Sequence, residues 1–168
     1  MEYVLVSSCL LGNAVRYDGH GKLSLNPILQ QWIEEGRVVP VCPEVESGMP
    51  IPRPPAEITN GQGGISVLAG TARVMDNDGC DVTLQFIDGA DLALKKVEAR
   101  GIRIAVLKDG SPSCGSSYTY DGSFLGRKVQ QVGVTAERLR RAGVLVFNEE
   151  QFKIAQSEIE RFERTNAV

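Results

Sequence analysis

Short apolar runs that alternate with helix-like segments are the feature that most constrains the fold of this 168-residue chain. Four runs have the length and β-branched character of buried strands. They cover Tyr3–Ser7, Arg37–Pro43, Ile102–Lys108 and Val144–Phe147. Strands and helices in alternation form a mostly parallel sheet with helices on its faces. We therefore expect an α/β, Rossmann-like fold in a single domain that spans residues 1–168.

Helix signals separate these runs. Asn26 can cap a helix, Pro27 suits its first turn and Gly36 can end it. Four of its residues share one apolar face: Ile28, Leu29, Trp32 and Ile33. Further helices are expected over about 82–100 and over 135–142, each followed by a glycine. In the last helix, with Asn148 as its cap, four residues form an apolar stripe: Phe152, Ala155, Ile159 and Phe162.

The middle of the chain, from Glu44 to Asp81, is rich in Gly, Pro and polar residues. It contains the stretches "GMPIPRPP" and "NGQGG". Runs of this length without regular structure are uncommon in compact domains unless they form functional loops or lids. We expect irregular loops here.

Charge and composition exclude several classes of function. The formal net charge is −3, and the Lys and Arg residues are scattered, which argues against broad nucleic-acid binding. The amino-terminal stretch has an acid where a signal peptide carries basic residues, and no apolar run has the length of a membrane span. These features predict a cytoplasmic protein, in which cysteines serve metal binding or catalysis more often than disulfides.

Three of the four cysteines follow the ends of predicted strands: Cys9, Cys42 and Cys114. The carboxyl ends of parallel strands share one edge of a sheet, where ligands bind near a topological switch point. We therefore expect the three thiols to converge, although each could simply fill the core as a small apolar side chain. Cys80 follows no comparable strand, and we interpret it as such a structural cysteine.

Three convergent thiols favour metal binding over nucleophilic catalysis. A catalytic cysteine needs a base, normally a histidine, and the only histidine is His20 in a Gly-flanked loop. A zinc site remains possible, but the cysteines lack the close pairs typical of zinc fingers. Thiolates are the standard ligands of iron–sulfur clusters, and three of them would leave one iron open. The spacing alone indicates a three-thiolate metal site with a vacant position.

These cysteines lie in motifs that are recognisable. The motifs are "VSSCLLGNAVRYDG" (Val6–Gly19), "CPEVESGMPIPR" (Cys42–Arg53) and "LKDGSPSCG" (Leu107–Gly115). They resemble the DUF523 family, whose characterised members are thiouracil desulfidases of the TudS type. The segments "DGCDVT" and "GVTAERLRRAGVLVF" are also similar to the family, so the resemblance spans nearly the whole chain.

The resemblance implies a [4Fe-4S] cluster held by Cys9, Cys42 and Cys114, with the fourth iron open. Family members convert thiolated uracils to the oxo base and release hydrogen sulfide, and the substrate sulfur binds the open iron. Glu44 and Ser111 occupy the positions of the family's proposed catalytic acid and serine. A carboxylate two residues after a ligand is also held close enough to act as a general base.

Other residues of the motifs are candidates for substrate binding. Three belong to the first motif, where they could equally form a structural loop network: Arg16, Tyr17 and Asp18. Arg53 could bind an anionic group such as a nucleotide phosphate through its planar guanidinium group. Ser113 competes with Ser111 for the catalytic role and is a further substrate-binding candidate. The family pattern has a second glycine where this chain has Ser47, which concerns loop shape rather than the ligands.

The leading hypothesis is an iron–sulfur-dependent desulfidase for thiouracil or its nucleoside or nucleotide. Two rivals use the same three cysteines: a non-catalytic iron–sulfur sensor and a zinc-dependent hydrolase. We expect a small-molecule partner and neither membrane association nor broad nucleic-acid binding.

Overall fold

The computed structural model describes residues 1–167 and contains a parallel sheet of four strands. Its strands are β1 (Val4–Ser7), β2 (Val38–Val41), β5 (Ile104–Leu107) and β8 (Leu145–Asn148). They lie in the order β2-β1-β5-β8, and every neighbouring pair is parallel. Each strand overlaps one of the four apolar runs of the sequence. The predicted α/β fold with a mostly parallel sheet is confirmed.

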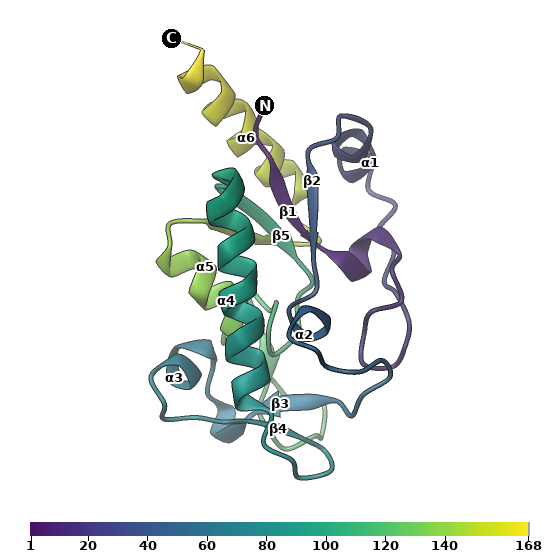
Figure 1. Cartoon of the computed structure of the whole chain (residues 1–168), viewed down its shortest axis with the longest axis vertical. Helices are drawn as coiled ribbons and strands as arrows, with labels where there is room; N and C mark the ends of the chain where they lie inside the picture. The colour runs from purple at the N-terminus through teal and green to yellow at the C-terminus, as the bar shows by residue number, and fades with distance from the viewer. Residues whose placement is uncertain (168) are drawn as a thin grey trace.

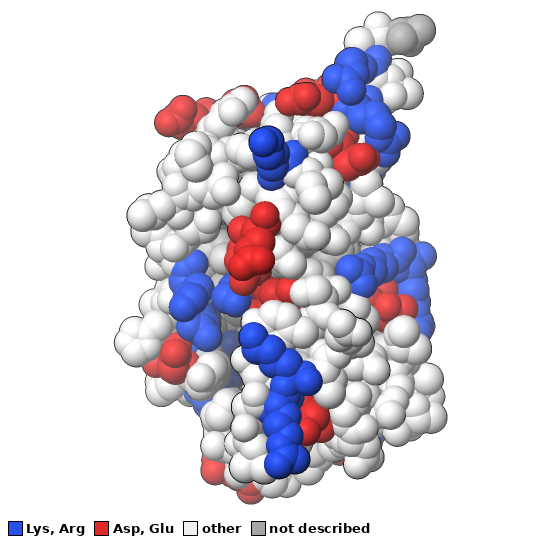
Figure 2. Space-filling view, turned by 180° about the vertical axis from the view of Figure 1, so that it is seen from behind, with Lys and Arg blue, Asp and Glu red and all other residues white. Residues whose placement is uncertain are grey.

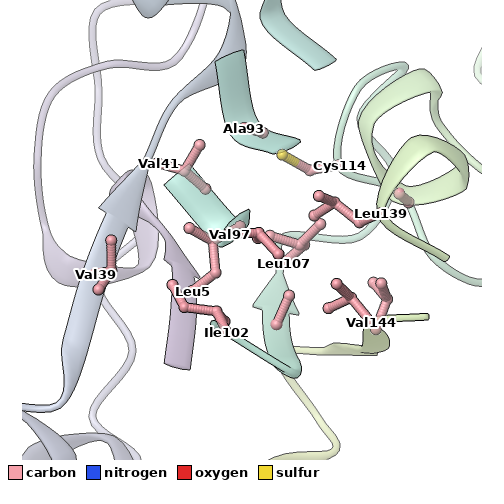
Figure 3. Close-up of a cluster of buried hydrophobic side chains, with 13 residues drawn as sticks. Leu5, Val39, Val41, Ala93, Val97, Ile102, Leu107, Cys114, Leu139 and Val144 are labelled. Atoms are coloured by element: carbon pink, nitrogen blue, oxygen red, sulfur yellow. The ribbon is translucent and has the colours of Figure 1, made fainter. Parts of the chain in front are cut away.

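Helices cover both faces of this sheet, and both chain termini lie at one end of the molecule (Figure 1). The four long helices are α1 (Pro27–Glu34), α4 (Thr83–Arg100), α5 (Val134–Arg141) and α6 (Phe152–Asn166). In β1, Val4 and Val6 join an apolar cluster with α1 and α6. Leu5 faces the other way, into a cluster with α4 and α5 that Figure 3 shows. This alternation follows the two-residue period of a strand.

The first helix, α1, agrees with its sequence signals except at Ile33. The Ile28 backbone N–H donates to Asn26 Oδ1 at 2.9 Å, as expected of the cap. Trp32 is fully buried and donates from Nε1 to Gln156 Oε1 of α6 at 2.6 Å. Ile33 is 43% exposed, so its assignment to the buried face was wrong. It lies one position beyond Trp32, where the helix has already turned toward solvent.

The last helix, α6, buries the predicted apolar stripe but does not begin at the predicted cap. Its buried residues are Phe152, Ala155 and Ile159, and Phe162 packs partly buried against the same cluster. Asn148 is the last residue of β8, and Gln151 precedes the helix. The Asn148 side chain instead accepts a hydrogen bond from the Glu150 N–H at 2.9 Å. The prediction of Asn148 as cap was therefore wrong, because this asparagine caps a turn between strand and helix.

Regular structure also occurs between residues 44 and 81, where the sequence predicted loops only. The elements are α2 (Pro43–Glu46), β3 (Ala56–Ile58), α3 (Gly64–Leu68) and β4 (Val74–Asp76). Strands of three residues are too short to show a two-residue period in sequence. The antiparallel β3–β4 pair covers a third apolar cluster, which includes Ile58, Val74 and Phe86.

The remaining elements are short. They are two turns of 3-10 helix, η1 (Ser8–Leu11) and η2 (Thr59–Gly61), and a hairpin of β6 (Thr119–Tyr120) and β7 (Lys128–Val129). Among residues 1–167, no helix is both long and apolar enough to cross a membrane. On the face seen in Figure 2, Lys and Arg form several small groups separated by acidic and uncharged residues.

Gly89 of α4 allows a close contact with α2. A Cβ atom at this position would lie 2.5 Å from the Pro43 carbonyl oxygen and 2.8 Å from the Pro43 carbonyl carbon. Such distances require the backbone of one element to move. Because Pro43 lies between Cys42 and Glu44, the contact determines where both of these side chains are presented.

Replacing Gly89 with alanine should therefore destabilise the protein. The substitution Gly89→Ala should lower the free energy of unfolding by about 1–3 kcal/mol through overpacking. In an ordinary helix interior the same exchange is stabilising by roughly 0.5–1 kcal/mol. Urea denaturation measures the difference, with Asp88→Ala at the adjacent exposed position as control. A Gly89→Ala protein at least as stable as wild type would contradict the close contact.

Candidate metal centre

The structure brings three cysteines to one cavity at the carboxyl edge of the sheet. Cys9 lies in η1 directly after β1, Cys42 follows β2, and Cys114 lies in the loop after β5. The chain passes from β1 outward to β2 on one side and later to β5 on the other, so β1 and β5 flank a topological switch point. All three cysteines line a cavity of about 390 Å³.

Cys80 and His20 lie elsewhere. Cys80 is exposed and outside the wall of this cavity, so it does not fill the core as expected. The His20 side chain is 78% exposed and is also absent from the wall. Its Nδ1 lies 3.5 Å from an oxygen of Asp18. No histidine among residues 1–167 is therefore placed to activate a cysteine in the cavity.

The three thiols are poor nucleophiles in this environment. Burial raises the pKa of Cys9 to about 11 and that of Cys42 to about 12. Burial also raises the pKa of Cys114 well above its usual range, and the Glu44 carboxylate adds to the effect at Cys42 and Cys114. A neutral thiol neither attacks nor binds a metal well, because both roles need the thiolate. Metal binding here must displace protons from these thiols.

A buried carboxylate and two serines stand beside the thiols. Glu44 is 8% exposed, and its Oε2 lies 3.7 Å from the Cys42 sulfur. Ser113 Oγ donates to Glu44 Oε1 at 2.5 Å, and Ser111 Oγ lies 2.9 Å from Ser113 Oγ. The two hydroxyl groups and the carboxylate thus form one hydrogen-bonded chain. It joins the loop after β5 to the turn after β2.

The two serines of this chain differ in their access to the cavity. Ser111 lines the cavity, whereas Ser113 is fully buried and does not. The Ser113 carbonyl accepts hydrogen bonds from the N–H groups of Thr135 and Ala136 in the first turn of α5. This anchorage holds Ser113 behind the wall, so its hydroxyl does not face the cavity. Ser113 links Ser111 to Glu44 instead.

Residues of the first and second motifs form another part of the wall. Arg16, Tyr17 and Arg53 line the cavity. Arg53 donates from Nη2 to the Val15 carbonyl at 3.0 Å and from its backbone N–H to the Tyr17 carbonyl at 2.8 Å. Asp18, a candidate for substrate binding, is not in the wall. Its carboxylate accepts from the His20 N–H at 3.0 Å, which makes it part of a surface turn.

Asp109 organises the loop that carries Cys114, and the sequence reasoning missed it. Its Oδ1 accepts hydrogen bonds from four backbone N–H groups, those of Gly110, Ser116, Ser117 and Tyr118. The Ser117 hydroxyl and the Asn148 side chain donate to Oδ2. Burial opposes ionisation, but the hydrogen bonds from Ser117, Tyr118 and Ser116 hold the pKa of Asp109 below its usual range. The signal available in the sequence was an aspartate followed by Gly and several Ser residues, which is typical of a turn whose Asp side chain accepts backbone hydrogen bonds.

Lys108 and two tyrosines of the cavity wall were also missed. Tyr118 and Tyr120 meet edge to face, with ring centroids 6.0 Å apart. Their alternation in the stretch "YTY" is compatible with a short strand but says nothing of a pocket. The other polar residues in the wall are Ser7, Ser8, Glu57, Lys108 and Asp109.

Three cysteine thiols are a donor set that suits an iron–sulfur cluster. Among residues 1–167, no three His, Cys, Asp or Glu side chains lie close enough together to hold one metal ion. In an iron–sulfur cluster each thiolate binds a different iron. Three free cysteines line one cavity here.

Comparisons with known proteins find a family model, a sequence relative and a solved structure that match this chain. Residues 4–151 match the model of the family described as 2-thiouracil desulfurase. An uncharacterised protein of Bacillus subtilis (strain 168), YbbK, is 40% identical over 148 residues, which are 88% of this chain and 96% of that protein. A solved structure described as the [4Fe-4S]-dependent thiouracil desulfidase TudS is 44% identical. It superposes with a TM-score of 0.86 over 95% of this chain and 99% of the other.

Removing the charge of Asp109 should loosen the loop that carries Cys114. Asp109→Asn replaces one acceptor oxygen by an NH₂ group that faces donors, so unfolding should become easier by about 1–3 kcal/mol. Thermal and urea denaturation measure this loss. Asp121 accepts similar hydrogen bonds from Ser123 in an exposed turn, so Asp121→Asn is the matched control and should leave stability unchanged.

The effect of Asp109→Asn should depend on pH. Because the pKa of Asp109 is lowered by folding, its ionised form stabilises the protein above the ordinary value of 3.8. This contribution is lost as the pH falls through the lowered pKa. The stability difference between wild type and Asp109→Asn should therefore shrink in acid, and a constant difference would contradict the role of the carboxylate.

Proposed function

This chain belongs to the 2-thiouracil desulfurase family, and on that basis we propose that it is a [4Fe-4S]-dependent thiouracil desulfidase. It removes sulfur from a thiolated uracil, as the free base, nucleoside or nucleotide, and forms the oxo base and hydrogen sulfide. One observation carries the proposal: Cys9, Cys42 and Cys114 converge on a single cavity. The whole chain acts as one domain in the cytoplasm, where reducing conditions keep thiols available.

The three thiolates of Cys9, Cys42 and Cys114 would hold the cluster and leave one iron without a protein ligand. When bound, the cluster supplies a Lewis-acidic iron that binds the substrate sulfur and weakens the C–S bond. The overall reaction is a hydrolysis. One water supplies the oxygen of the new carbonyl group, and its two protons leave with the sulfide.

Glu44 is the general base in this proposal. Its carboxylate is buried in the cavity wall beside Cys42, where it can accept a proton from the attacking water. Ser111 faces the cavity, and Ser113 connects it to Glu44. Because hydroxyl groups both donate and accept, this chain can pass a proton between the substrate and the carboxylate. Ser113 acts as a positioning residue.

The structure favours an enzyme over a non-catalytic sensor that uses the same cysteines. A cavity of about 390 Å³ is within the range of small-molecule sites, whereas a sensor needs no such space. Metal analysis of the purified protein distinguishes the zinc hydrolase, which would contain zinc in place of iron and sulfide. We propose a small thiolated pyrimidine as the partner, with Tyr17, Arg16 and Arg53 of the wall contributing to its binding.

Anaerobic purification should give a brown protein that contains iron and sulfide and releases sulfide from 4-thiouracil. Cys114→Ala should abolish both the bound iron and the sulfide release, because one of three ligands is lost. Cys80→Ala is the matched control and should preserve both, since Cys80 is exposed and outside the cavity. A colourless wild-type protein with full activity would disprove the proposal.

Glu44→Gln should separate catalysis from cluster binding. The amide keeps the shape and an acceptor for Ser113 but cannot take a proton, so kcat should fall by about 10²–10⁴-fold. Iron content and visible absorption should match wild type, because Glu44 is not a ligand in this proposal. Glu44→Asp restores the carboxylate and should recover part of kcat. Equal kcat in wild type and Glu44→Gln would exclude Glu44 as the base.

A further inference from the structure

Lys108 places a partly buried cation in the cavity wall. It directly follows β5, and its side chain is 18% exposed, against 30% for Arg16 on the first motif. Arg16, Lys108 and Cys9 all line the same cavity. The guanidinium group of Arg53, the other cation of the wall, donates to the Val15 and Pro50 carbonyls.

The Lys108 ammonium group is held from behind the wall. Its Nζ lies 2.8 Å from Glu149 Oε1 and donates to the Asp109 carbonyl at 2.9 Å. The other oxygen of Glu149 accepts from the Asp109 N–H at 2.8 Å, so the glutamate is itself fixed. Glu149 is not part of the cavity wall, whereas Lys108 is. An ammonium group has three N–H donors, and among residues 1–167 only two of them have partners here.

The charge of Lys108 is stable. Burial works to lower its pKa, but the hydrogen bond and the negative charge of Glu149 raise it above its ordinary value. Lys108 is therefore protonated at neutral pH and serves as a hydrogen-bond donor rather than as a base.

We propose that Lys108 Nζ donates a hydrogen bond to the ring carbonyl oxygen of the thiolated uracil that carries no sulfur. This inference rests on the proposed function and adds a specificity-determining residue to it. Glu44, which lines the same cavity, is a hydrogen-bond acceptor and cannot serve this oxygen. A charged donor that is left without an acceptor when a ligand fills the cavity costs binding free energy. The site should therefore reject thiolated pyrimidines that lack the oxygen.

The test compares 4-thiouracil with pyrimidine-4-thione, which lacks this oxygen and also one ring N–H. Wild-type holoprotein should prefer 4-thiouracil in kcat/KM by about tenfold or more, the ratio expected for a charge-assisted hydrogen bond. Because the missing N–H affects both proteins alike, the contribution of Lys108 is the change between them: in Lys108→Met the preference should fall by about tenfold, with iron content unchanged. Lys108→Arg should restore part of it. Lys153→Met, which removes an exposed lysine from α6, should retain the wild-type preference.

Binding of the product gives a readout that does not need turnover. Uracil should bind to wild-type holoprotein more tightly than to Lys108→Met by a similar factor in calorimetry. An unchanged substrate preference and unchanged uracil affinity in folded, iron-loaded Lys108→Met would overturn the inference and leave the proposed function intact. Failure of the wild-type protein to release sulfide from any thiolated base would instead refute the proposed function.

Discussion

The cavity depends on the pairing of β1 with strands on both sides. This strand pairs in parallel with both neighbours. The pairing with β2 extends to Ser7 and Val41, and the pairing with β5 extends to Val6 and Val106. At the end of β1, the Ser7 hydroxyl accepts the Lys108 N–H at 2.9 Å. Three loops distant in sequence therefore leave the sheet at one place. A shift of β1 by one residue would exchange its faces and separate the cysteines.

The cavity wall contains groups of both signs of charge. Glu44 lies beside Cys42, and Arg16, Arg53 and Lys108 line the same cavity. A hydrolysis of a thiocarbonyl group needs a base near the attacked carbon and donors near the atoms that gain negative charge. A cavity wall with both acidic and basic side chains can meet both needs for one bound ring.

The alternation of strands and helices predicted the sheet, because the four apolar runs were long enough to be recognised as buried strands in the sequence. It also predicted the convergence of the cysteines, since parallel strands share a carboxyl edge. Asp109 and Lys108 escaped prediction because their roles depend on Glu149 and Asn148, which β8 brings beside them from a distant part of the chain. The burial of Ser113 behind the cavity wall could not be predicted, because it depends on hydrogen bonds to α5 that no local sequence pattern reveals.

Two of the three cavity cysteines, Cys9 and Cys114, are also part of the apolar core. Cys114 packs with Ala93 and Leu139 on one side of the sheet (Figure 3), and Cys9 packs with Leu10 on the other. With their raised pKa values these thiols are neutral without metal, and a neutral thiol packs as a small apolar side chain. Helices on both faces bury the sheet with apolar side chains of the chain itself. A metal that binds at the cavity must therefore displace protons from thiols that are already packed in the core.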